Sequence, residues 1–336
     1  MQKRCLVLFS GGLDSILACK VLQRQKIEVT AVKFITPFFS YELKSEDKAR
    51  AYIENTKLKY GIDVVVVDIS EEYLKMVVNP AHGYGRYLNP CIDCKILMIK
   101  RAMSMLKDFS ASFIATGEVL GQRPMSQRRD TLRIIERDSG AEGILLRPLS
   151  SGYFKETLPE KRGVVNRNEL PQITGRSRKL QMALARDFNI MDYPSPAGGC
   201  VLTDPILSRR FKKIFDKWPN FTANDCVLAQ IGRHLLLPGG SWLVIGRNKS
   251  ENQRLKQLVK EKDFCLKAIN VPGPFSILRY FQAEDDLELA SKIIVRYTKG
   301  KKLPAQVEVE RIKNSYNEVY NVEAFPSDTQ IHSLMF

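Results

Sequence analysis

The stretch Ser10-Gly11-Gly12-Leu13-Asp14-Ser15 decides the fold of this chain. It follows an apolar run at residues 5–9 and precedes a run with helical apolar spacing at residues 16–22. A strand, a glycine turn and a helix start form an anion site, because glycines let the backbone approach a phosphate and the first N–H groups of a helix lack partners within it. Ser10 and Ser15 add hydroxyl donors, and Asp14 adds an acceptor for Mg²⁺ or for the turn itself. The alternative interpretation is a glycine-rich turn without a ligand.

Composition narrows the classes of protein and partner. The chain has 336 residues, a length that fits two domains, and a net charge of +15, which indicates either a polyanionic partner such as nucleic acid or a solvated basic surface. Seven cysteines, an odd number without framework spacing, argue against a disulfide scaffold. No apolar run has the length of a membrane span, so we expect a cytoplasmic protein that does not bind membranes.

Strand and helix signals alternate along the first part of the chain. Strands are expected at residues 28–35, 64–69 and 112–116, and helices at 45–60 and 92–106. Repeated β-α-β units predict an α/β fold, a doubly wound parallel sheet whose ligands bind beyond the carboxyl ends of the strands. A boundary near Asp204-Pro205 separates this domain, residues 1–204, from a smaller α+β module, residues 205–336.

The cysteines fall into two groups. Cys5, Cys19, Cys226 and Cys265 lie in apolar runs and are interpreted as structural. Cys91 and Cys94 form C-x-x-C at the start of an expected helix, and Cys200 follows a Pro/Gly turn. These three could hold a [4Fe-4S] cluster with one iron left open. A zinc site with His82 as the nearest histidine in sequence, a redox dithiol with a persulfide on Cys200, and inert buried thiols stay open as alternatives.

Two further segments could complete a nucleotide site. The loop that begins Thr116-Gly117 and contains Gln122 would form a second wall over ATP, and Arg147 would neutralise phosphate charge unless it is a surface arginine. Basic residues after this loop are candidates for an RNA path: Arg123, Arg128, Arg129, Arg133, Arg137, Lys161, Arg162, Arg176, Arg178 and Lys179. A solvated basic face is the alternative for each of them.

The string S-G-G-L-D-S resembles the PP-loop of ATP pyrophosphatases; it lacks the lysine of a Walker A loop. Together with T-G-E-x-x-G-Q-x-x-x-S-Q and L-R-P-L it resembles the catalytic domain of tRNA 4-thiouridine synthases of the ThiI type, over about residues 4–204. C-x-x-C with a later cysteine is similar to the iron–sulfur branch of tRNA thiolases. Residues 230–234 and 244–252 resemble an RNA-binding module of the NFACT-R type. The resemblance starts directly at the PP-loop, so we expect neither the ferredoxin-like and THUMP region nor the rhodanese tail of the ThiI family in this sequence.

The resemblance implies an adenine nucleotide alpha-hydrolase-like domain that adenylates a uridine carbonyl of tRNA and replaces its oxygen with sulfur. The product would be 4-thiouridine or, second, the 2-thiouridine made by MnmA-type enzymes. Asp14, Cys91, Cys94 and Cys200 would be catalytic, and those three cysteines would bind the metal. ATP and Mg²⁺ would be held by a larger set: Ser10, Gly11, Gly12, Asp14, Ser15, Lys33, Phe34, Thr116, Gly117, Gln122 and Arg147.

The expected partners are tRNA and a sulfur donor, either sulfide or a persulfide protein, and a homodimer is compatible with these expectations. Two alternatives stay open for the function. One is a non-catalytic RNA-binding factor, which the charge and the C-terminal module favour. The other is a PP-loop enzyme that acts on a small molecule.

Overall fold

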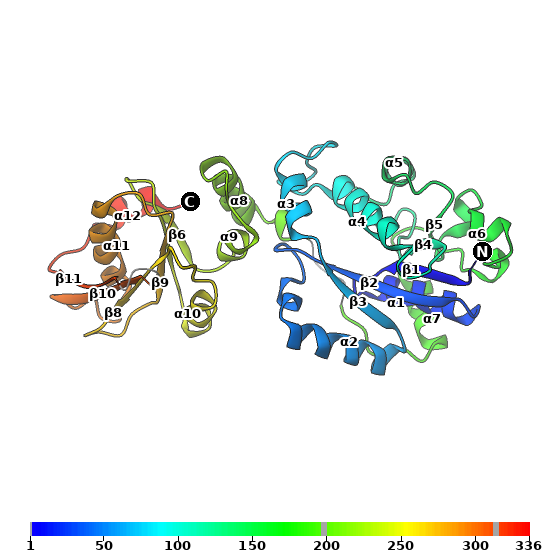
Figure 1. Cartoon of the computed structure of the whole chain (residues 1–336), viewed down its shortest axis with the longest axis horizontal. Coiled ribbons are helices and arrows are strands. Elements are labelled where there is room, and N and C mark those ends of the chain that lie inside the picture. Colours follow the sequence, from blue (N-terminus) through cyan, green and yellow to red (C-terminus); the bar gives the residue numbers. More distant parts are fainter. Residues whose placement is uncertain (1, 196–199, 312–315) are drawn as a thin grey trace. The chain divides into compact units, whose positions relative to one another are not determined.

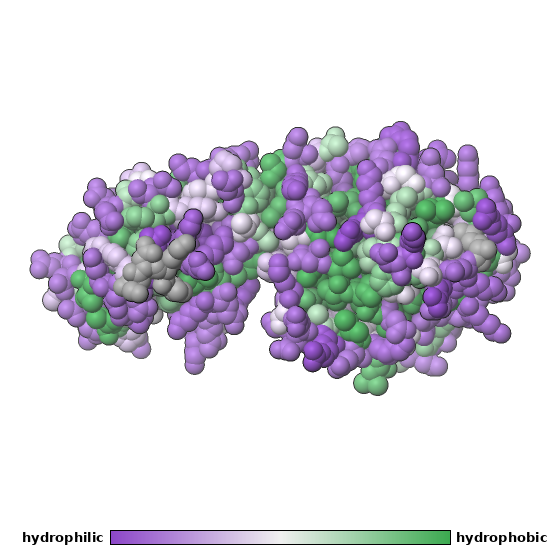
Figure 2. Space-filling model, in the orientation of Figure 1, coloured by the Kyte–Doolittle hydropathy of each residue, from purple (hydrophilic) through white to green (hydrophobic). Residues whose placement is uncertain are grey.

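A computed structural model describes residues 2–195, 200–311 and 316–336 of the chain. The chain divides into two compact units, residues 1–205 and 206–336, each built around a sheet of its own (Figure 1). Charged and polar side chains dominate the surface of both units in the view of Figure 2. No helix among the described residues is long and apolar enough to cross a membrane.

The N-terminal unit contains a five-stranded sheet in the order β3-β2-β1-β4-β5, in which neighbouring strands are parallel. The α/β doubly wound prediction is therefore confirmed. The strands are β1 (Arg4–Leu8), β2 (Glu28–Ile35), β3 (Asp63–Asp68), β4 (Phe113–Thr116) and β5 (Leu145–Leu146). Continuous β-branched and apolar runs form these strands because both faces of the sheet are covered. Central strand β1 has buried residues from Cys5 onward.

Helices cover the two faces of this sheet (Figure 1). α1 packs against β1, β2 and α7, while α4 packs against β1, β4, α3 and α5. The α-helices of the unit are α1 (Leu13–Arg24), α2 (Glu46–Tyr60), α3 (Ser70–Val78), α4 (Cys91–Met105), α5 (Arg129–Ser139), α6 (Leu158–Lys161) and α7 (Lys179–Asp187). Alternate strand residues such as Cys5 and Val7 pack with Ile16 and Leu17 of α1 in one apolar core. Burial of each large apolar side chain of this kind contributes roughly 1.5–3 kcal/mol.

The C-terminal unit contains a six-stranded antiparallel sheet in the order β11-β10-β8-β9-β7-β6. The strands are β6 (Arg233–Leu236), β7 (Trp242–Ile245), β8 (Phe264–Ala268), β9 (Ser276–Arg279), β10 (Ala305–Arg311) and β11 (Tyr316–Val322). The helices are α8 (Pro205–Lys217), α9 (Ala223–Leu228), α10 (Lys249–Lys256), α11 (Glu284–Arg296) and α12 (Asp328–Leu334). α11 buries Leu287, Ile293 and Ile294 against the sheet, which gives this unit a separate core. The predicted α+β module is confirmed.

Candidate nucleotide and cysteine site

The segment from Ser10 to Ser15 connects β1 to α1 at the carboxyl end of the sheet. Gly11 has φ +84°, a left-handed conformation that favours glycine, and a Cβ there would lie 2.8 Å from the Tyr52 hydroxyl. Ser15 Oγ donates to the Gly12 carbonyl at 2.8 Å, and the Gly12 N–H donates to Ser10 Oγ at 3.3 Å. The turn is thus held open by its own hydroxyls at the start of a 12-residue helix. This geometry suits a phosphate group.

Lys33 contributes its side chain to this turn. Its Nζ donates to the Ser10 carbonyl at 2.6 Å and lies 3.9 Å from the position of a Cβ on Gly11. The residue is only 8% exposed, and no ion pair of Lys33 is found among the described residues. Burial lowers the pKa of Lys33, and the Glu42 carboxylate opposes this effect. The family resemblance implies that the backbone at residues 32–34 meets the adenine, which stays a prediction; Phe34 is buried in β2, and the Lys33 amine lies beneath the glycine loop.

Asp14 lies among buried polar atoms that lack partners. Its Oδ2 accepts a hydrogen bond from Gln122 Nε2 at 2.9 Å, while its Oδ1 is buried and has no partner among the described residues. Burial raises the pKa of Asp14, and the Gln122 amide and the charge of Arg178 oppose this. Gln122 Oε1 and Arg178 Nε are also buried without a partner among the described residues, while the Gln181 amide lies near Asp14 and acts to lower its pKa. Buried polar groups are normally satisfied, so this group indicates a ligand, and an orphaned carboxylate oxygen fits Mg²⁺.

The loop after β4 packs directly on the start of α1. A Cβ on Gly117 would lie 2.6 Å from the Asp14 carbonyl carbon and oxygen, so only glycine fits. Thr116 Oγ1 donates to Glu118 at 3.1 Å. Burial opposes ionisation of Glu118, but the charges of Lys95 and Arg147 outweigh it, and the pKa of Glu118 lies below its ordinary value. Gly117 and Gln122 therefore contact Asp14, and Thr116 ends the strand just before them; their role in nucleotide binding stays a prediction.

Arg147 lies on the far side of Glu118. Its guanidinium donates to Glu118 at 3.3 Å, to Glu136 at 2.7 Å and to the Leu132 carbonyl at 3.2 Å. It also lies over the Phe154 ring, 5.0 Å from the centroid, and is 3% exposed. These protein partners occupy its donors in the structure. Its role as a ligand of the ATP phosphates therefore stays a prediction for which no contact is seen.

The structure brings Cys91, Cys94 and Cys200 into one region, next to buried Tyr73 of α3. Cys91 and Cys94 lie in the first turn of α4, where Asn89 Nδ2 donates to Cys91 Sγ at 2.9 Å. Burial raises the pKa of the Cys94 thiol to about 12, with the nearby Cys200 and Cys91 adding to the rise. Burial also raises the pKa of Cys200, again with a contribution from Cys91. The three thiols are therefore close enough to act on one another electrostatically.

These thiols fit an iron–sulfur cluster in the chemistry of their donor atoms. Within the described ranges, however, no three His, Cys, Asp or Glu side chains form a group already arranged to hold a metal ion. The cluster therefore stays a prediction. The Pro/Gly turn before Cys200, apart from residues 194 and 195, lies outside the described residues.

His82, the nearest histidine for the zinc alternative, has other partners. Its Nδ1 lies 3.0 Å from Asp93 Oδ1, and its Nε2 lies 2.9 Å from Asp138 Oδ2. Its backbone N–H donates to Asp93 at 3.0 Å. Both ring nitrogens are thus occupied by carboxylates, which tie the loop before α4 to α4 and α5. The zinc site with His82 has no support in this arrangement.

Sequence patterns did not reveal Tyr73, Gln181 or the side-chain role of Lys33. Tyr73 reads as one more apolar position of an amphipathic helix, and Gln181 as one polar residue of another. Each reaches the site through tertiary contacts from far along the chain, and no local pattern marks such a residue. Arg178 was placed on a predicted RNA path, and the structure puts its charge near Asp14 instead.

Two family models match the chain. Residues 1–160 match the thiamine biosynthesis protein (ThiI) family, and residues 232–335 match the NFACT protein RNA-binding domain. The second match lies within the C-terminal unit and includes all six of its strands.

Individual proteins are similar over the N-terminal half. A probable tRNA sulfurtransferase of Thermococcus kodakarensis is 26% identical over 174 residues, which are 51% of this chain and 44% of the relative. The tRNA-specific 2-thiouridylase MnmA of Syntrophotalea carbinolica is 28% identical over 167 residues, 48% of this chain and 44% of the relative. The chain thus spans less than half the length of these curated relatives.

Among solved structures, the U34-tRNA thiolase NcsA of Methanococcus maripaludis with its [4Fe-4S] cluster is similar to this chain. It has 18% identity and a TM-score of 0.34, and the match covers 68% of this chain and 71% of that one. A score of this size carries no argument about the site. The chain is therefore similar to the ThiI family over residues 1–160 and to the NFACT protein RNA-binding domain over residues 232–335.

Proposed function

We propose that the chain is an ATP-dependent tRNA sulfurtransferase that adenylates a uridine carbonyl and replaces its oxygen with sulfur. The observation that carries the proposal is the phosphate loop with Asp14 at its centre, whose unpartnered Oδ1 lies among other unsatisfied buried groups. The ThiI family match of residues 1–160 supports the reaction type, and the RNA-binding domain match supports an RNA substrate.

The chain's own residues suit the first half of the reaction. A uridine carbonyl oxygen is a poor leaving group, so its attack on the α-phosphorus of ATP, with loss of pyrophosphate, turns it into an AMP ester. The N–H groups at the start of α1 and the buried Lys33 amine would stabilise the charge that develops on the phosphates. Asp14 would hold Mg²⁺, which neutralises phosphate charge when it is bound.

The second half of the reaction needs a sulfur nucleophile at the activated carbon, from which AMP leaves with the oxygen. Cys91, Cys94 and Cys200 would hold a [4Fe-4S] cluster, which supplies sulfur binding at an open iron when it is present. Tyr73, buried beside Cys94, would position that thiol. In the rival version Cys200 carries a persulfide and pairs with Cys91 or Cys94 after transfer.

The substrate position is proposed from the resemblance. The ThiI match supports 4-thiouridine as the product, and the similarity to 2-thiouridylases supports 2-thiouridine as the second choice. The sulfur donor, a homodimer and a cytoplasmic location stay predictions.

The test is nucleoside mass spectrometry of tRNA from a strain that lacks the gene, with the gene restored as wild type, as Asp14→Asn or as Cys200→Ser. Loss of one thionucleoside that only the wild type restores supports the proposal and identifies the modified atom. An unchanged set of thionucleosides in the deletion strain would contradict the proposal.

A non-catalytic RNA-binding factor is the second candidate, and the RNA-binding domain match is the observation that favours it. That candidate predicts tRNA binding that is the same in wild type and Asp14→Asn, with no AMP or pyrophosphate formed from ATP by the wild type. Purification without oxygen, followed by iron and zinc analysis, tests the cluster separately.

A further inference from the structure

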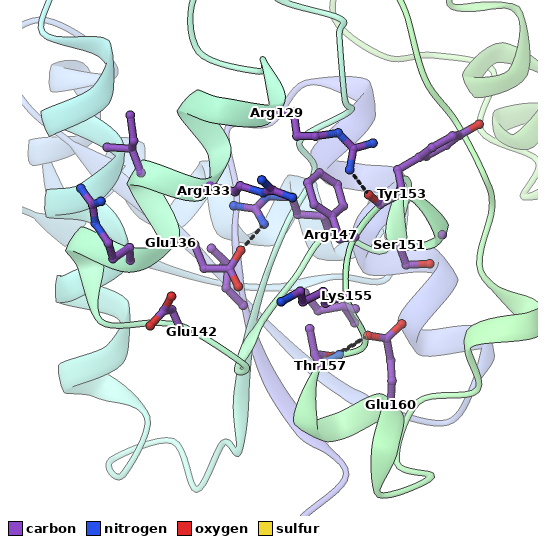
Figure 3. A pocket seen from close by; sticks show the side chains of 16 residues that line it. Arg129, Arg133, Glu136, Glu142, Arg147, Ser151, Tyr153, Lys155, Thr157 and Glu160 are labelled. Carbon is purple, nitrogen blue, oxygen red and sulfur yellow. Dashed lines mark hydrogen bonds and ion pairs between the residues drawn. The ribbon is translucent and has the colours of Figure 1, made fainter.

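A second cavity lies beside strand β5, apart from the phosphate loop (Figure 3). Its volume is about 600 Å³, within the range of sites that hold a nucleotide-sized ligand. Helix α5 forms one wall and the segment from Ser151 to Glu160 forms the facing wall. None of the residues that line it belongs to the turn from Ser10 to Ser15.

The unbalanced charge in this cavity is positive. Three carboxylates line it: Glu136 is bound to Arg147 at 2.7 Å, Glu160 is bound to Arg167 at 2.9 Å, and the charge of Glu142 acts on Arg137 of the same lining, so each carboxylate has a cationic protein group nearby. The exposed side chains of Arg133 and Lys155, which also line the cavity, form no ion pair or side-chain hydrogen bond within the described part of the chain. Because no carboxylate pairs with these two cations, they favour a negatively charged occupant.

The rest of the lining suits a flat apolar group. The half-buried ring of Phe154 lies under the Arg147 guanidinium, and Ile134, Leu145 and Leu146 add apolar surface. Nucleobases stack on such aromatic and guanidinium planes. A free phosphate would leave most of this volume empty, whereas a nucleotide places a phosphate and a base in one site.

The cavity is also linked to the phosphate loop. Arg147 forms part of its wall and at the same time holds Glu118 at 3.3 Å. Glu118 follows Gly117, which packs against Asp14 with no room for a side chain. An occupant of the cavity would therefore contact Arg147, and the ion pair of Arg147 with Glu118 connects the cavity to the segment that packs on Asp14.

We propose that this cavity binds one nucleotide of the RNA substrate, with its phosphate at Arg133 and Lys155 and its base against Phe154. The inference rests on the proposed function, because it assigns part of the RNA to the catalytic unit itself. It names a subsite on the β5 side of the sheet, formed by the residues from Arg129 to Glu160 that line the cavity.

The test uses the full chain and a single-stranded RNA of eight uridines that carries one 5-iodouridine, without ATP. Ultraviolet light should crosslink the RNA to the peptide that contains Tyr153 and Phe154. Arg133→Gln should weaken binding of this RNA about fivefold at low salt and reduce the slope of log affinity against log salt by about 0.7. Phe154→Leu should reduce the crosslink to that peptide about fivefold.

Arg50→Gln is the matched control. Arg50 is exposed on α2, which packs on β3 at the other edge of the sheet. Its substitution by Gln removes the same charge as Arg133→Gln. Equal binding and equal salt slopes for Arg133→Gln and Arg50→Gln would overturn the proposal, as would crosslinks confined to other peptides. Competition of the crosslink by UMP as strongly as by the unlabelled RNA would overturn the assignment to an RNA strand. The outcome is separate from the proposed function, since Asp14→Asn should crosslink like the wild type even though it forms no AMP.

Discussion

Lys33 is a buried lysine that lies beneath a glycine loop and has no carboxylate in ion-pair contact among the described residues. Burying an amine that has no carboxylate partner costs free energy, so Lys33 lowers the stability of the fold unless a ligand compensates for its charge. We therefore expect Lys33→Met to weaken ATP binding about tenfold while leaving the free energy of unfolding equal or higher. Isothermal calorimetry with ATP and Mg²⁺, together with urea unfolding, measures both quantities.

Lys20→Met provides the matched control for this experiment. Lys20 Nζ donates to the Tyr60 carbonyl at 3.1 Å, so the control also removes a lysine that bonds to a backbone oxygen. It should leave ATP binding unchanged. Equal ATP affinity in the two variants would show that Lys33 does not contact the phosphates.

His82 is held between two carboxylates and should titrate above its ordinary pKa. The hydrogen bond to Asp93 raises the pKa of His82, burial opposes this, and Asp138 raises it further; Arg137, which pairs with Asp138, also faces this cluster. The stabilisation from this contact should be complete below about pH 6.5, the unfolded value, and should be lost as pH rises through the higher folded value.

NMR titration of the imidazole C–H signals can follow this directly, because the chain has only three histidines. The signal that is missing from His82→Asn should have a midpoint above pH 6.5, and Asp93→Asn should lower that midpoint. A wild-type midpoint at or below pH 6.5 would contradict the ion pairs. His234 serves as an internal reference, since burial keeps its pKa well below the ordinary value.

At the level of elements, the glycines in the loops after β1 and β4 differ in how much room each has for a side chain. Gly12 has ordinary backbone angles, and a Cβ there would meet only Ser10 Oγ, at 3.5 Å. Gly12→Ala should therefore leave the free energy of unfolding unchanged or raise it by about 0.5 kcal/mol, yet weaken ATP binding at least tenfold because the methyl group occupies the phosphate approach.

Gly117→Ala, in contrast, should lower the free energy of unfolding. Its Cβ would lie 2.6 Å from the Asp14 backbone, so the loop must move away from α1 at a cost of about 1–3 kcal/mol in unfolding free energy. Urea unfolding and calorimetry on both variants test the pair. If Gly12→Ala binds ATP like the wild type, the turn does not hold the phosphates at this position.

An element could be predicted from the sequence when the residues that determine it lie close together along the chain. The strand at residues 28–35 and the helix expected at 92–106 were predicted to within one residue, because hydrophobic periodicity is a local signal. The turn after β1 was predicted equally well from its glycines and their neighbours. Helix α5 was interpreted only as a basic stretch, and Tyr73 and Gln181 were missed at the site, since their roles depend on contacts across the fold. Cys200 was grouped with Cys91 and Cys94 from the sequence, whereas Tyr73 beside them was not.

At the scale of the whole molecule, each unit has a core of its own. We expect calorimetry to resolve two unfolding transitions. ATP with Mg²⁺ should raise the temperature of one transition only, by the equivalent of about 2.7 kcal/mol when ATP is present at 100 times its dissociation constant.

Asp14→Asn should remove this shift without merging the two transitions. A single cooperative transition, with its whole area moved by ATP, would contradict the separate cores. The transition that ATP leaves unmoved is then assigned to residues 206–336.

The pairing of β1 with β4 has a consequence for synthesis of the protein on the ribosome. Cys5 pairs with Phe113, so one edge of the first strand stays open until β4 has emerged from the exit tunnel. During that interval the nascent chain presents an apolar strand edge, the kind of surface on which chains aggregate and to which chaperones bind. Translation speed between the codons for β3 and β4 should therefore influence how much of this protein reaches the folded state.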